Sequence, residues 1–178
     1  MAAKILVLSS NPRRDLNLER EIGDLIKAVQ RLSSFEVKIA LAVCPNELQE
    51  LFLEHKPQII HFCGHGAGEQ GLVLHDQHGR EQIVSTEALA ELFKILSNNI
   101  DCAVFNTCDS HHQAKAMVAY VNYAIGMSEA ILDRAAYIFA VGFYQGLGYG
   151  ESIERAYELG CNAIQLQLLK ANASPWIR

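Results

Sequence analysis

Two apolar segments of the chain each end in a short run of polar and small residues, QIIHFCGHG over Gln58–Gly66 and IDCAVFNTCDS over Ile100–Ser110. Continuous apolar runs of this length are typical of strands in a parallel sheet that is covered on both faces. His65 follows the apolar part of the first segment, and Cys108 follows the apolar part of the second. Because the carboxyl ends of parallel strands share one edge of a sheet, we expect both side chains to face one cleft if the two strands are neighbours.

The rest of the chain alternates between strand and helix patterns. We expect strands over residues 5–9, 37–43, 58–63, 100–105 and 121–126, helices over 15–32, 47–55, 85–96, 128–145 and 152–168, and a small hairpin over 71–75 and 82–84. This order predicts an α/β domain with a mostly parallel sheet and helices on both faces. No linker or repeat is visible, so residues 1–178 are expected to form a single domain, with a frayed tail from about residue 170.

The composition excludes several functional classes. The chain has 178 residues, a formal net charge of −5 and no cluster of Lys and Arg, so nucleic acid is a poor candidate partner. No apolar run approaches membrane-spanning length, and no membrane association is expected. The cysteines are odd in number and scattered, which disfavours a secreted disulfide framework and favours the cytoplasm; they are Cys44, Cys63, Cys102, Cys108 and Cys161. Nothing in the sequence indicates oligomeric state.

A cysteine and a histidine at one sheet edge are the two side chains that a cysteine peptidase needs for catalysis. A thiolate attacks the carbonyl carbon of the peptide, while a nearby imidazole favours the thiolate and later protonates the leaving amine. We therefore predict Cys108 as nucleophile and His65 as acid and base. The backbone N–H groups of Gly66 and Cys108 are the predicted oxyanion hole. This chemistry needs no cofactor.

Other polar residues in the two segments have simpler interpretations. Asp109 and Ser110 are expected to cap a helix, and Asp15 is a candidate cap for the first helix. His61 is expected to be a hydrogen-bonded histidine inside the sheet. His61 and Cys63 also alternate with His65, a spacing that suggests metal ligation together with Cys108, His111 or His112, but no CxxC or HxxxH pair accompanies it, and we predict no metal.

The segments HFCGHG (61–66) and VFNTCDS (104–110), together with AVGFY (140–144) and GESIERAY (150–157), resemble CHAT domains. This resemblance covers the chain from the first strand to about Gln167. It implies a caspase-like three-layer sandwich and a His/Cys dyad, which falls on His65 and Cys108. It also implies a cysteine endopeptidase acting on protein or peptide substrates, with a regulatory partner or sensor module beside it.

Related peptidases set their specificity with a charged pocket for the residue before the scissile bond. Asp109, Asp133 and Glu151 are the acidic residues that we expect to line it, so cleavage after a basic residue is predicted. A catalytically silent module of the same fold, binding a peptide or a partner protein, stays open as the alternative. A receiver domain of the response-regulator type is excluded, because the first strand ends in Ser9-Ser10-Asn11 and not in an acidic pair.

Overall fold

A mostly parallel sheet forms the centre of the protein. The computed structural model describes residues 2–30, 35–127, 133–167 and 175–177. Along the sheet the strands follow the order β2 (Phe35–Leu41), β1 (Ala3–Ser10), β3 (Ile59–Gly66), β6 (Cys102–Asn106), β7 (Tyr123–Met127) and β8 (Pro175–Ile177). The first five are parallel to their neighbours, and β8 is antiparallel to β7. A hairpin of β4 (Gly71–His75) and β5 (Glu81–Ser85) pairs with the end of β3.

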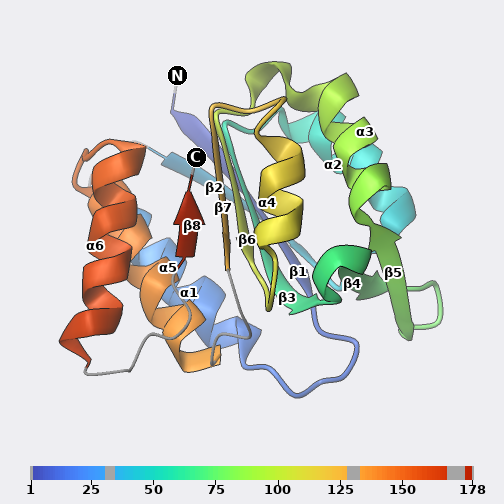
Figure 1. Cartoon of the computed structure of the whole chain (residues 1–178), viewed down its shortest axis with the longest axis horizontal. Helices are drawn as coiled ribbons and strands as arrows, with labels where there is room; N and C mark the ends of the chain where they lie inside the picture. Colours follow the sequence, from blue (N-terminus) through green and yellow to red (C-terminus); the bar gives the residue numbers. More distant parts are fainter. Residues whose placement is uncertain (1, 31–34, 128–132, 168–174, 178) are drawn as a thin grey trace.

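Helices cover both faces of this sheet (Figure 1). One layer holds α1 (Leu18–Val29), α5 (Asp133–Gly148) and α6 (Ile153–Leu166), and the other holds α2 (Leu48–His55), α3 (Thr86–Leu96) and α4 (His111–Met117). Alternate residues of β1 divide between the layers: Ile5 and Val7 pack with α1 and α5, whereas Leu6 and Leu8 pack with α2 and α3. The predicted three-layer α/β sandwich of the caspase type is confirmed.

The start of α1 differs from the expectation. Asn17, and not Asp15, caps this helix, because its side-chain oxygen accepts a hydrogen bond from the backbone N–H of Arg20 at 3.3 Å. The helix therefore begins at Leu18. Asp15 is left in the loop between β1 and α1, at the carboxyl edge of the sheet, where it is available for another contact.

Strand β3 is longer than its apolar run. The predicted strand ends at Cys63, but β3 continues to Gly66, because His65 and Gly66 pair with Val73 and Leu72 of β4. Gly64 permits this continuation: it has φ +149°, and a Cβ there would lie 2.1 Å from the carbonyl oxygen of Ser10. His65 is consequently held by a strand ladder.

The C-terminal part also departs from the predicted boundaries. The helix expected over 128–145 continues through Gly148, and its first residues, 128–132, lie outside the described part of the chain. The fraying expected from about residue 170 is wrong for Pro175–Ile177, which add an antiparallel edge strand to β7. Backbone hydrogen bonding at an open sheet edge is the physical reason.

Candidate active site at the carboxyl edge of the sheet

Strands β3 and β6 are neighbours, so their carboxyl ends bring His65 and Cys108 to the same edge. The register pairs Cys63 with Asn106, and each of the two side chains follows that pair by two residues. The backbones touch beyond it, because a Cβ added to Gly66 would lie 2.1 Å from the carbonyl oxygen of Cys108. Cys108 itself is partly exposed. The structure thus brings the predicted nucleophile, base and glycine together.

The imidazole of His65 is held by a carboxylate. Its Nε2 lies 2.7 Å from Oδ1 of Asp15, while the His65 side chain is only 12% exposed. Desolvation acts to raise the pKa of Asp15, but the hydrogen bond and the charge of His65 outweigh it and the pKa is lowered. A carboxylate hydrogen-bonded to one ring nitrogen fixes the orientation of the ring. Asp15 is therefore placed to orient His65.

A second charged pair extends from the same loop. Nε of Arg13 donates to Oε1 of Glu81 at 2.7 Å. The hydrogen bond with Glu81 is the main cause that raises the pKa of Arg13, and the charges of Glu81, Asp15 and Cys108 contribute further. The loop after β1 therefore places a cation within electrostatic range of Cys108.

Asp109 and Ser110, which follow Cys108, do not make the helix-capping hydrogen bonds that were predicted for them. Ser110 precedes α4 but makes no side-chain capping bond. Its single O–H is shared between the carbonyl oxygens of Phe105 at 2.6 Å and Thr107 at 2.7 Å, and its Oγ accepts from the N–H of Met127 at 3.0 Å. Asp109 is no cap either, because it adopts a left-handed conformation with φ 50°. Ser110 instead ties the loop that carries the predicted nucleophile, residues 107–110 (the nucleophile loop), to β6 and β7.

The pairing of β3 with β4 orients one of the two predicted oxyanion donors, the N–H of Gly66. The N–H of Ala67 donates to the carbonyl oxygen of Gly71 at 2.9 Å. Hydrogen-bonded and non-hydrogen-bonded pairs alternate along an antiparallel ladder, so the next pair, Gly66 with Leu72, is of the second kind. The N–H of Gly66 consequently points away from β4.

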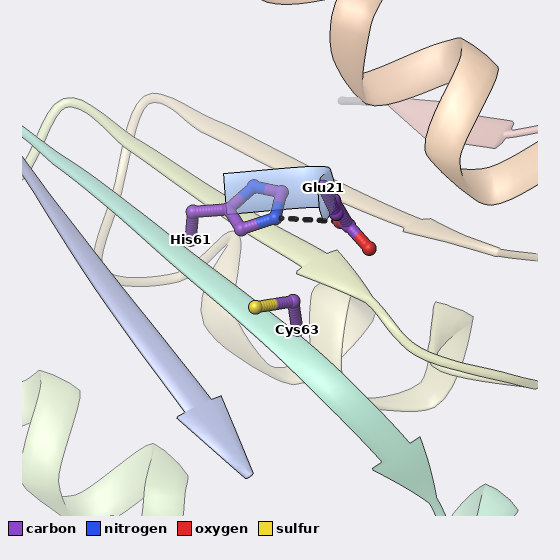
Figure 2. A group of neighbouring side chains, drawn as sticks. All are labelled: Glu21, His61 and Cys63. Atoms are coloured by element: carbon purple, nitrogen blue, oxygen red, sulfur yellow. Dashed lines mark hydrogen bonds and ion pairs between the residues drawn. The ribbon is translucent and has the colours of Figure 1, made fainter. Parts of the chain in front are cut away.

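A buried polar cluster lies behind the edge, between the sheet and α1 (Figure 2). His61 is fully buried, with Nε2 3.4 Å from Oε1 of Glu21 and Nδ1 3.1 Å from the hydroxyl of Tyr144. Burial raises the pKa of the neighbouring Cys63 thiol well above its ordinary value. His61 thus has the hydrogen-bonded, interior position that its sequence context indicates. Asn106 joins the cluster by donating from Nδ2 to Oε1 of Glu21 at 2.6 Å.

Two groups of side chains within the described residues are close enough to hold a metal ion. Glu21, His61 and Cys63 form the buried group, and Asp109, His111 and His112 form a partly exposed one. Oδ1 of Asp109 lies 3.0 Å from Nδ1 of His111 and 4.0 Å from Nε2 of His112. Neither group includes Cys108, which was one of the ligands considered for a metal from the sequence.

Of the three acidic residues expected in a specificity pocket, the two whose side chains are described, Asp109 and Glu151, lie far apart. Asp109 is at the site, next to Cys108, and its Oδ2 would lie 3.0 Å from a Cβ on Gly68. Glu151 pairs with Arg155 at 2.7 Å and follows the end of α5 that packs against Ala28, in the last turn of α1. Since α1 starts at the site and runs away from it, Glu151 is at the far end and the prediction is wrong for it. The side chain of Asp133 lies outside the described residues.

An α/β sandwich with histidine and cysteine at the ends of neighbouring strands defines a caspase-like class of domain. The profile of the CHAT domain family matches residues 2–159, and the chain belongs to that family. A "Probable protease" of Gillisia limnaea is 27% identical over 175 residues, covering 93% of this chain and 31% of the relative. A "Roc-COR-CHAT protease" from an unknown prokaryotic organism is 23% identical over 174 residues, covering 91% of this chain and 16% of the relative.

The chain thus spans a third or less of the length of these curated relatives. Among solved structures, the pyridoxal kinase from Staphylococcus aureus aligns with a TM-score of 0.45 at 9% identity, over 92% of this chain and 87% of that chain. A similarity at that level carries no inference about function. In the part of the chain that is described, the helices are too short or too polar to cross a membrane.

Proposed function

We propose that the chain is a cysteine endopeptidase domain that cleaves protein substrates after a basic residue. Cys108 is the nucleophile and His65 the acid and base. The observation that carries this proposal is the meeting of the two strand ends, with Gly66 packed against the Cys108 carbonyl and His65 held by Asp15. The protease names of two relatives support the same class.

The proposed reaction proceeds through an acyl-enzyme. The Cys108 thiolate attacks the scissile carbonyl carbon, and the carbonyl oxygen becomes an oxyanion that the N–H groups of Gly66 and Cys108 stabilise. His65, protonated and oriented by Asp15, gives its proton to the leaving amine as the C–N bond breaks. Water then attacks the thioester carbon while His65 takes one of its protons, and the C–S bond breaks, which releases the carboxylic acid and restores the Cys108 thiolate.

A regulatory partner is part of the proposal, because the relatives are much longer than this chain. We expect a sensor module or partner protein to control access to the site. The segment from Gly66 to the hairpin of β4 and β5 borders the site and is the element through which such control would act.

The test is covalent labelling with a peptidyl acyloxymethyl ketone, followed by mass spectrometry. We expect one adduct, on Cys108, that is lost in Cys108→Ala and reduced on the order of 100-fold in rate in His65→Ala. Cys44→Ala is the matched control, since Cys44 is also partly exposed but lies outside the site. Labelling that persists in both site variants would contradict the proposal and favour the silent peptide-binding module.

A further inference from the structure

A cavity of about 620 Å³ opens beside the proposed dyad, between α1 and α5. Its lining includes Gly64, which directly precedes His65, and Asn106, which precedes Cys108 by two residues. Glu21 of α1 also lines it. The cavity therefore adjoins the place where the scissile bond would lie, and it is large enough for one long side chain.

Glu21 gives this cavity a buried negative group. The residue is 7% exposed, and one carboxylate oxygen accepts from Asn106 and faces His61 (Figure 2). The other oxygen points away from His61 in the same view. Among the described residues no Lys or Arg pairs with Glu21. A buried carboxylate is costly unless it is paired, and a cationic ligand would pair with the oxygen that points away from His61.

Asn106 adds a second acceptor without a partner. Its Nδ2 donates to Glu21 and, at 3.3 Å, to the carbonyl oxygen of Ala136, which fixes the orientation of the amide. Oδ1 is buried and has no hydrogen-bond partner in the described part of the structure. Asn106 is only 5% exposed, and buried acceptors of this kind are normally satisfied. A ligand that enters with several N–H donors would satisfy it.

The two arginines of the lining do not reverse this charge pattern. Arg20 has a side chain that is 70% exposed, and its guanidinium lies 5.3 Å from the ring centre of Tyr137. Arg134 is exposed and donates to Gln167 at 3.3 Å. Both charges face solvent, where salt and water screen them. Glu21 is the buried charge of the cavity, at the end nearest to the sheet.

We propose that this cavity receives the side chain before the scissile bond and that Glu21, with Asn106, selects arginine. The inference rests on the proposed peptidase function. A guanidinium carries five N–H donors in a planar fork, which matches a carboxylate and an amide oxygen better than the single ammonium of lysine does. Glu21 and Asn106 replace Glu151 as the specificity-determining residues of the site.

The test compares two fluorogenic peptides that differ only in arginine or citrulline before the scissile bond. Citrulline has nearly the same shape but no charge, so the ratio of kcat/KM values isolates the carboxylate and does not depend on the fraction of folded enzyme. We expect wild type to favour arginine on the order of 100-fold and Glu21→Gln to reduce the ratio to below about 5-fold. Glu19→Gln, which removes an exposed carboxylate from the same helix, should leave the ratio unchanged.

A ratio near one in wild type, or an unchanged ratio in Glu21→Gln, overturns the assignment. Agmatine supplies a readout that does not need catalysis: calorimetry on Cys108→Ala should detect its binding, and adding Glu21→Gln should abolish it. Binding of agmatine without any adduct on Cys108 would refute the peptidase but keep the guanidinium site. An adduct on Cys108 together with equal cleavage of both peptides would support the peptidase but refute the guanidinium site.

Discussion

Gly66 of β3 packs against the loop that carries Cys108, and Gly66→Ala tests whether this contact matters for activity. A Cβ at this position would lie 2.1 Å from the Cys108 carbonyl oxygen and 3.1 Å from Oγ1 of Thr107. Carbon and oxygen in contact need more than 3 Å, so the nucleophile loop must retreat by about 1 Å. A misplacement of 1 Å costs on the order of 100-fold in rate. The same overpacking should lower the free energy of unfolding by about 1–3 kcal/mol.

The assay is kcat/KM on an arginyl peptide together with the rate of Cys108 alkylation, each measured at a temperature where urea curves show the variant folded. Gly23→Ala is the control, because nothing lies within 4 Å of a Cβ there. That substitution in α1 should stabilise the protein by about 0.5–1 kcal/mol and leave cleavage unchanged. A Gly66→Ala protein that cleaves at the wild-type rate would refute the view that this close approach positions the nucleophile.

Two further changes test the surroundings of the site. Asp15→Asn should lower kcat about 10-fold with little change in KM or in the urea midpoint, because it removes the charge that orients His65; a change in KM alone would contradict this. Burial raises the pKa of Cys102, so the unfolded chain loses this thiol proton above pH about 8.5 and the folded chain keeps it. The free energy of unfolding therefore falls as pH rises. Cys102→Ala should make this fall less steep between pH 8.5 and 9.5, by up to about 1.4 kcal/mol per pH unit. An unchanged slope in the variant would refute Cys102 as the cause.

The order of strands and helices could be predicted because it rests on local patterns. Apolar runs mark β1, β3 and β6, and the strand-end rule for parallel sheets places His65 and Cys108 at one edge. The short strand β8 was missed, because antiparallel pairing at an edge depends on a partner about 50 residues away in the chain.

Asp15, Arg13 and Glu21 illustrate what could not be predicted. Asp15 and Arg13 occupy a polar loop, where their types and spacing are equally typical of capping and of solvation; only the packing of that loop onto β3 and β5 gives them partners. Glu21 did leave a signal. It lies between Leu18 and Leu25 on the apolar face of α1, where a carboxylate is costly, and such a violation of the helical pattern indicates a functional position.

The buried polar side chains also gather at the edge of the sheet where the candidate site lies. In the described chain these residues are Ser9, Ser10, Glu21, His61, Asn106, Thr107, Ser110 and Gln113. All except His61 lie at the carboxyl ends of β1 and β6, on the nucleophile loop or on the helices that flank it, and His61 bonds to Glu21. Because each such group costs stability unless it is paired, a fold optimised for stability alone would spread them or remove them. Their concentration at one edge, with Oδ1 of Asn106 and Oγ1 of Thr107 still without partners among the described residues, agrees with the proposed peptidase site, in which a substrate would complete these hydrogen bonds.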